Sequence, residues 1–174
     1  MIELYDRYSQ ESRDLHESLV ATGLSQLGVV IDADGFLPDG LVSPFTYYLG
    51  YEKGKPLYFN QVSVPAFWEI SGNNQSARIE DRTQERAVIH YADGMQVRLV
   101  KQVDWKDLEG RVRQVDHYNR FGACFATTTY SADSDPIMTV YQDVNGQEVL
   151  LENHVTGDIL LTLPSQSMRY FANK

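Results

Sequence analysis

Two Asp-x-Asp triplets come nearest to chemistry by residue type and spacing: Asp32-Ala33-Asp34 and Asp133-Ser134-Asp135. Converging carboxylates hold hard divalent cations, and some sugar transferases use such a triplet to hold a metal with a sugar diphosphate. Asp, Ser and Gly also build tight turns for backbone reasons alone. Because Gly35 and Pro136 follow the triplets directly, the pattern favours turns, and we expect no metal site.

The start of the chain could in principle bind phosphate, because the amides at a helix N-terminus attract anions. Residues 2–5 are typical of a strand, Ser9 of a helix N-cap, and Gly23 of the position just past a helix end. The turn before the helix has no glycine, and Asp6 and Glu11 would repel a phosphate. We therefore expect no nucleotide or other cofactor here.

The other reactive side chains lack a catalytic or metal-binding spacing. The histidines are scattered along the chain at His16, His90, His117 and His154. No serine has the context of a nucleophile elbow. Cys124 lies among small and apolar residues, which favours a buried hydrophobic role over a nucleophile. Asp104 and Asp116 are twelve residues apart, and a structural repeat explains that spacing better than an acid–base pair.

A turn signal recurs about every twelve residues along the second half of the chain. It is formed by Gly110, Gly122, Gly146 and Gly157, and Ser134 with Asp135 fills the remaining slot. Alternating runs of strand-forming residues separate these turns. This pattern predicts a long antiparallel meander whose turns need residues tolerant of positive φ. Such a surface favours binding over chemistry.

The region before the meander predicts further elements. Ser43-Pro44 indicates the start of a short helix over 44–49 that Gly50 ends. Residues 56–64 and 66–71 are typical of strands that Pro65 separates, and two more strands follow within 76–91.

Together the elements predict a mainly β (α+β) fold. A short strand–helix unit with a turn-rich connection would occupy residues 1–50, and an extended antiparallel β-sheet domain residues 51–174. We expect one face of that sheet to be wetter than the other.

Composition excludes several classes of function. The net charge of −9 over 174 residues argues against nucleic-acid binding and against electrostatic docking on anionic lipid. The single cysteine suits a reducing cytoplasm. The first residues do not resemble a secretory leader, and no apolar run approaches a membrane span. A cytoplasmic protein is therefore expected.

Aromatic and arginine side chains on the predicted strands are the best candidates for partner binding. These candidates are Trp68, Trp105, Arg111, Arg113, Tyr118 and Tyr130. They suit either protein docking or stacking on sugar rings. The competing interpretation is that about half of them line the core face of the sheet.

Five long segments carry a resemblance to a known family. They are LYDRYSQESRDLHESLVATG, DADGFLPDGLVSPFTYYLGY, GKPLYFNQVSVPAFWEISG, KQVDWKDLEGRVRQVDHYN and ENHVTGDILL. The chain resembles the N-terminal region of the glycosyltransferase-stabilising (chaperone) subunits of the accessory Sec system of streptococci and related Gram-positive bacteria. The resemblance implies a catalytic partner subunit, with which the pair transfers N-acetylglucosamine from its UDP form to serine-rich-repeat adhesins.

The resemblance has further implications. The strand–helix unit would belong to a degenerate Rossmann-like half of a GT-B fold, most of which would lie outside this chain. The partners would be the catalytic glycosyltransferase subunit and the Ser/Thr-rich adhesin acceptor. Peripheral association with the cytoplasmic membrane through the full complex, and a homodimer through a sheet edge, are left open.

The leading hypothesis is a non-catalytic protein-interaction domain. One alternative is a carbohydrate-binding module that recognises acceptor already modified with N-acetylglucosamine. Another is an oligomerisation hub like that of teichoic-acid glycosyltransferases. A transferase in its own right is the weakest hypothesis, because the chain lacks a donor site.

Overall fold

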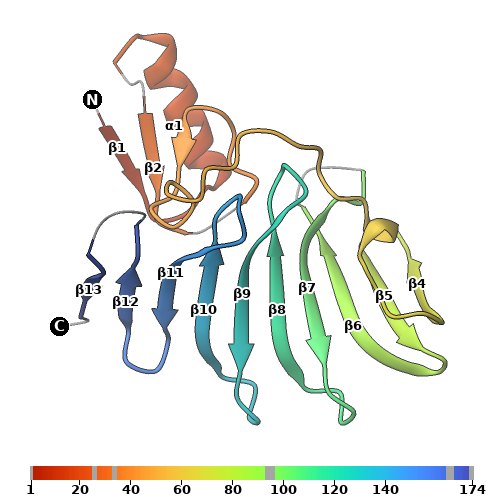
Figure 1. The fold of residues 1–174 in the computed structure, drawn as a ribbon. Helices are drawn as coiled ribbons and strands as arrows, with labels where there is room; N and C mark the ends of the chain where they lie inside the picture. Colours follow the sequence, from red (N-terminus) through yellow and green to blue (C-terminus); the bar gives the residue numbers. More distant parts are fainter. Residues whose placement is uncertain (1, 25–26, 33–34, 93–96, 164–166, 173–174) are drawn as a thin grey trace.

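The computed structural model describes residues 2–24, 27–32, 35–92, 97–163 and 167–172. It contains two sheets, one of three strands and one of ten (Figure 1). The order of the strands in the large sheet follows the chain, so each strand pairs with the next. The expected fold class is confirmed: the protein is mainly β, and a strand–helix unit precedes a long antiparallel meander.

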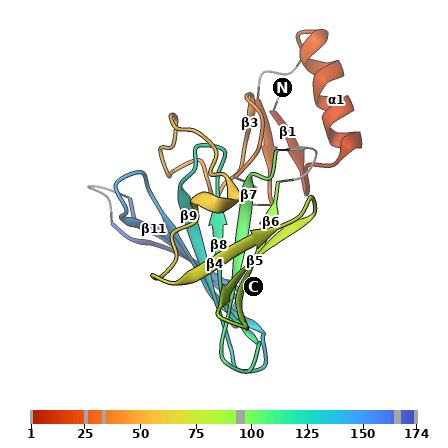
Figure 2. The same cartoon turned by 90° about the vertical axis from the view of Figure 1, so that its right-hand side faces the viewer.

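The N-terminal unit comprises β1 (Ile2–Tyr5), α1 (Gln10–Ala21), β2 (Leu27–Val30) and β3 (Leu41–Val42), and its three strands are parallel. It lies beyond one end of the strands of the large sheet (Figure 2). Buried His16 of α1 contacts the carboxylate of Glu3 in β1 at 2.9 Å and ties the helix to the small sheet. Within the described residues, no helix has the length and apolar character that a membrane span requires.

Helix α1 begins at the expected residue. Ser9 accepts a hydrogen bond from the amide of Ser12 at 3.2 Å, and the Ser12 hydroxyl accepts one from the amide of Ser9 at 2.7 Å. Gly23 follows the helix with a φ of 71°, as expected. The side chains of Ser9 and Ser12 thus cap each other's amides and form a capping box at the start of the helix.

The large sheet runs from β4 to β13. Its strands are β4 (Trp68–Gly72), β5 (Ser76–Asp81), β6 (Gln84–Tyr91), β7 (Val100–Lys106), β8 (Val112–Tyr118), β9 (Cys124–Tyr130), β10 (Pro136–Gln142), β11 (Glu148–Asn153), β12 (Asp158–Leu161) and β13 (Arg169–Phe171). All pairs are antiparallel. The four predicted turn glycines have φ between 74° and 84°, and Ser134 has 66°. The turn prediction is thus confirmed, including the slot without glycine.

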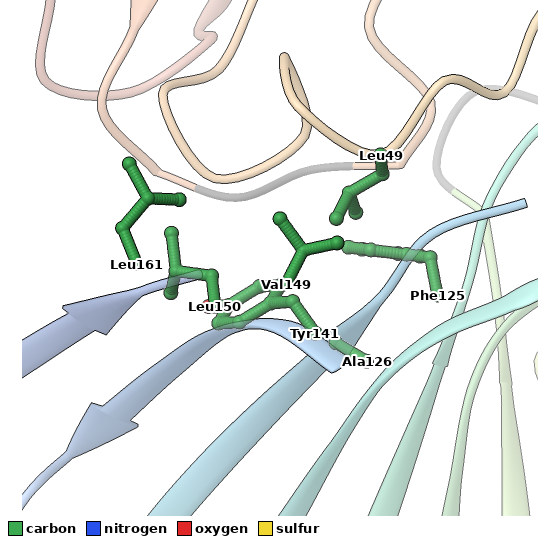
Figure 3. Packing of buried hydrophobic residues seen from close by; sticks show 7 residues of the cluster. All are labelled: Leu49, Phe125, Ala126, Tyr141, Val149, Leu150 and Leu161. Carbon is green, nitrogen blue, oxygen red and sulfur yellow. The ribbon is translucent and has the colours of Figure 1, made fainter. Parts of the chain in front are cut away.

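Both faces of the large sheet carry a core, each over a different half. We call face A the side of Val103 and Trp105, and face B the side of Asp104. Over β4–β8, face A buries Ala77, Ile79, Ala87, Ile89 and Val103. Over β9–β12, face B buries Ala126, Tyr141, Leu150 and Leu161 beneath Leu49 (Figure 3). The expectation of one wetter face therefore has to be corrected, because each face is covered over half of its width.

Bulges increase the number of buried side chains in the second core. The register shifts between His117 and Tyr118, opposite Phe125, and between Tyr141 and Gln142, opposite Val149. An extra residue in one strand breaks the strict alternation of side chains. Phe125 and Val149 are consequently buried together with the residues that follow them, at 2% and 4% exposure.

The helix expected over 44–49 is wrong. The segment forms turns, in which the amides of Thr46 and Tyr47 both donate to the carbonyl of Ser43. A run this short cannot offset the cost of helix nucleation, and aromatic and β-branched residues favour helix weakly. Burial of Leu49 in the core instead fixes its path, and Gly50 ends it with a φ of 72°.

The strand expected over 56–64 is also wrong. Only Tyr58 forms an isolated bridge, with Leu99, and the single turn η1 (Phe59–Gln61) follows it. The Gln61 side chain accepts a hydrogen bond from the amide of Tyr58 at 2.9 Å, which closes that turn. The segment's apolar residues, with Val62 buried, cover face A in place of pairing in the sheet.

Candidate protein-interaction surface

A row of apolar side chains crosses the uncovered part of face A. It consists of Val140, Leu151, Leu160 and Tyr170, and we call it the apolar row. Each member lies directly opposite the next on the neighbouring strand, so all four share one face. Adjacent residues such as Tyr141, Leu150 and Leu161 point to the other face and are buried in the core. The first three members of the row stay half-buried, and Tyr170 is 61% exposed.

The apolar row ends at an edge of the sheet. β13 pairs with β12, and on its other side no strand of the described residues follows. The side chains of Met168, Tyr170 and Phe171 are all more than half exposed there. An edge strand offers backbone groups to another chain, and the exposed apolar side chains add contact area. Row and edge together form a continuous surface suited to a protein partner.

Three of the residues predicted to bind a partner lie against the core of face A. Trp68, Trp105 and Tyr118 pack on the buried cluster over β4–β8. The Trp105 indole donates a hydrogen bond to Asp116 at 2.7 Å, and the Arg86 guanidinium lies 5.2 Å from the ring centroid of Trp68. These contacts fit the alternative interpretation of core-lining aromatic residues.

The other three candidates lie elsewhere. Arg111 and Arg113 are both directed at Asp107, with their Nε atoms 3.1 and 3.6 Å from its Oδ2. Tyr130 lies two residues after Thr128 in β9 and therefore on face B. Burial and then the carboxylate of Asp104 raise its pKa. The structure therefore does not gather the six candidates into one patch, and their role in partner binding stays a prediction.

Sequence reasoning missed the apolar row. Val140, Leu151 and Leu160 lie in strands of the predicted meander, whereas β13, which carries Tyr170, was not predicted. The sequence did not show which face of the sheet other segments cover, because a strand with apolar residues on both sides does not reveal its covered side. Only the position of Leu49 and Phe45 over face B settles this.

The uncovered part of face B is polar. His90 contacts Asp104 at 2.7 Å, Gln102 donates to the same carboxylate at 2.8 Å, and Lys106 pairs with Glu85 at 2.6 Å. The hydrogen bond to Asp104 raises the pKa of His90, while burial and Lys106 act in the opposite direction. Charged groups dominate this surface, which makes it a poorer candidate for an apolar contact than the row.

The raised pKa of His90 predicts a pH-dependent contribution to stability. The unfolded-state pKa of histidine is about 6.5, and the folded-state pKa of His90 lies above it. Protonation of His90 therefore stabilises the fold in full at pH values below about 6.5, and this stabilisation is lost as the pH rises through the folded-state pKa. The imidazole is 45% exposed, so solvent screening limits the effect to roughly 0.5 kcal/mol. His90→Gln should therefore destabilise the protein more at about pH 5.5 than at about pH 8, measured by urea unfolding. An equal loss at both pH values would contradict this assignment.

Two of the candidate chemical groups, the second Asp-x-Asp triplet and Cys124, can be placed in the structure. Ser134 and Asp135 lie in the β9–β10 turn, where the Ser131 amide donates to the Asp135 carbonyl at 2.8 Å. Ala33 and Asp34 of the other triplet lie outside the described residues. Burial, with Asp116 nearby, raises the pKa of the Cys124 thiol to about 11. The thiol form is thereby favoured over the nucleophilic thiolate.

Comparison with known proteins places these two sheets in one family. Residues 68–172 match the family model for the GtfB middle domain, and residues 2–48 match that for the GtfB N-terminal domain. The chain is 91% identical over 174 residues to the UDP-N-acetylglucosamine–peptide N-acetylglucosaminyltransferase stabilizing protein GtfB of Streptococcus pneumoniae serotype 4. It is 52% identical over 176 residues to the protein of the same name from Streptococcus gordonii. The chain spans 39% of the length of each of these relatives.

Solved structures agree. A chain in the crystal structure of a GtfA/B complex bound to UDP and GlcNAc superposes with a TM-score of 0.94 at 52% identity, over 99% of this chain and 39% of that one. A chain of an accessory secretory protein 1, 2 and 3 complex from Streptococcus pneumoniae shares the fold, with a TM-score of 0.72 at 8% identity, over 93% of this chain and 39% of that one. The chain therefore belongs to the GtfB family, and its residues 2–48 and 68–172 correspond to the N-terminal and middle domains of that family.

Proposed function

We propose that this chain is the docking part of a GtfB-type stabilising subunit and binds a catalytic glycosyltransferase subunit without taking part in the chemistry. The observation that carries the proposal is the apolar row, left uncovered on a sheet that matches a chain of a GtfA/B complex over nearly its whole length. The printed name of the relatives, a stabilizing protein of a peptide N-acetylglucosaminyltransferase, supports the same role.

The physical basis of docking is the removal of the row from water. Each half-buried apolar side chain that a partner covers contributes on the order of 1 kcal/mol to association. The backbone of β13 can add hydrogen bonds if the partner supplies a strand. Such a contact would hold a catalytic subunit in its folded state by mass action, which is what stabilisation means physically.

Placing a charged side chain in the apolar row tests the proposal. In the full-length protein, Leu151→Arg and Leu160→Arg are each expected to weaken binding to the catalytic subunit at least about tenfold, because a charge would be buried at the contact. Val155→Arg is the matched control, since Val155 is 75% exposed in the β11–β12 turn and lies off the row. Binding would be measured by biolayer interferometry, with circular dichroism confirming that each variant folds. Unchanged binding by both folded row variants would rule out the row as the docking site.

Finer features of the function stay proposals. The edge of β13 could also pair with an extended Ser/Thr-rich acceptor or with a second copy of the chain, and both would compete with partner docking. Adding an acceptor peptide during the binding assay distinguishes these cases, because competition requires a shared edge. Peripheral association with a membrane through the full complex, and a domain boundary near residue 50, remain predictions from the sequence.

A further inference from the structure

Four side chains on face B are joined in a line by hydrogen bonds. His117 Nε2 contacts the Thr128 hydroxyl at 2.9 Å. The Thr128 and Thr139 hydroxyls are 2.8 Å apart, and the Thr139 hydroxyl contacts His154 Nε2 at 2.7 Å. Both threonines are buried, at 5% and 4% exposure. We call these four residues the histidine–threonine line, which ties β8, β9 and β10 to the residue that follows β11.

The three contacts fix the number of hydrogens in the line. Each contact needs one hydrogen, and each threonine hydroxyl supplies one. The third must come from an imidazole, so one Nε2 atom carries a hydrogen and the other accepts one. If both Nε2 atoms carried hydrogens, four hydrogens would share three contacts, and one contact would hold two hydrogens facing each other. The line therefore stays closed only while His117 and His154 differ at Nε2.

Glu152 gives the line its direction. Nδ1 of His154 lies 3.8 Å from Glu152 Oε1. A hydrogen on this nitrogen points towards the negative carboxylate, whereas a bare lone pair there would be repelled. His154 thus carries its hydrogen on Nδ1 and accepts the hydrogen bond of Thr139 at Nε2. His117 is then the histidine that donates from Nε2 to Thr128.

The surroundings of the line tolerate one positive charge better than two. Burial lowers the pKa of His117, while the nearby aspartates raise it and the nearby lysine lowers it. Carboxylates outnumber the lysine around the two histidines, so they attract a single charge, while burial and mutual repulsion oppose a second. The charged and titratable groups that face the line from β7, β8, β10, β11 and the end of β2 are Lys101, Asp104, Asp116, Tyr141, Glu152 and Asp32.

We propose that His117 and His154 act as one proton-binding unit, which holds a single extra proton and relays it between the two rings. A proton that binds Nδ1 of His117 makes this ring an imidazolium and leaves all three contacts in place. In the relay each group hands its own hydrogen to the next, from His117 Nε2 through the two hydroxyls to His154 Nε2. Three N–H or O–H bonds break and three form. The positive charge thereby moves from His117 to the side of Glu152.

A second proton opens the line. It places hydrogens on both Nε2 atoms, so one of the three contacts has to break. The folded protein therefore binds this proton less readily than the unfolded chain, in which histidine titrates at about 6.5. Because the unfolded state then binds more protons, this contact loses its stabilising effect as the pH falls below about 6.5. The line is thus a pH-sensitive tie across β8–β11, beside the pocket of about 300 Å³ where the end of β2 meets face B.

Nitrogen NMR of the histidine rings in the full-length protein tests the unit, with signals assigned through His117→Gln and His154→Gln. At about pH 8, where both rings are neutral, one Nε2 should carry a hydrogen and the other should not. On acidification both ring signals should move at a common midpoint, because the relay changes the hydrogens of both rings. The second proton should bind at least about tenfold more weakly, which places its step about one pH unit lower.

Variants of the threonines separate the line from the general surroundings of the histidines. Thr139→Val removes a hydroxyl of the line, and the two histidines should then titrate independently. Thr128→Val breaks the same line at the next residue and serves if Thr139→Val does not fold, while Thr139→Ser keeps the hydroxyl and should keep the coupled steps. Thr129→Val is the matched control, since Thr129 is exposed on face A of the same strand as Thr128.

Three outcomes would overturn the proposal. The first is a hydrogen on both Nε2 atoms, or on neither, at about pH 8. The second is independent titration of His117 and His154 in the unaltered protein. The third is coupled titration that persists in a folded variant without one of the two hydroxyls.

Discussion

The Phe125→Ala variant is expected to lose about 3–5 kcal/mol in its free energy of unfolding. Phe125 is 2% exposed and belongs to the cluster in which Leu49 meets the sheet (Figure 3). Leu49 lies in the segment between β3 and β4, which we call the connecting segment. Its ring lies 6.4 Å from those of Tyr141 and His117. Removing the ring leaves a cavity at the point where the connecting segment is held on face B. Urea unfolding followed by circular dichroism measures the loss.

Phe67→Ala is the matched control for this change. Phe67 is the same residue type, lies just before β4 and is 96% exposed. Its replacement should alter the unfolding free energy by less than about 0.5 kcal/mol. Comparable losses at both positions would show that Phe125 does not hold the second core together.

Gly122→Ala is the second change with a large expected effect, a loss of roughly 3 kcal/mol or more. Gly122 has a φ of 84°, and a Cβ atom there would meet the backbone oxygen of Lys55 at 2.2 Å. Backbone atoms cannot move aside cheaply, so the β8–β9 turn and the segment around residue 55 would have to separate. Thermal and urea unfolding would both detect the loss.

Gly110→Ala separates this contact from backbone strain. Gly110 sits in the preceding hairpin turn with a φ of 81°, and nothing lies within 4 Å of the position of its Cβ. Only the cost of a left-handed conformation remains, about 1–2 kcal/mol. Equal losses of unfolding free energy for the two variants would mean that the close approach of Gly122 to the backbone of Lys55 does not add to the cost of Gly122→Ala.

Local rules were sufficient for much of the fold. The glycine repeat predicted the meander because tolerance of a positive φ depends on the residue type itself and not on distant contacts. Ser134 adopts a positive φ at the one turn of the repeat that has no glycine. Ser9 likewise marked the start of α1 because capping depends on residues three apart.

Long-range packing decided the parts that sequence reasoning missed. Residues 44–49 and 56–64 carry helix or strand signals, but burial of Leu49 and Val62 against different faces of the sheet outweighs those weak preferences. The apolar row was missed for the same reason, since which face is covered depends on segments outside the strands. Trp68 and Trp105 were selected by residue type, and packing on the core explains them equally well.

Hydrogen–deuterium exchange of the full-length protein, alone and with the catalytic subunit, tests the docking role of the sheet most directly. Docking on the apolar row predicts slower exchange in peptides covering β10–β13, strongest at the edge strand β13, and unchanged exchange in β5 and β6. A stable complex in which β10–β13 exchange as fast as in the free protein would contradict the proposed role of this surface.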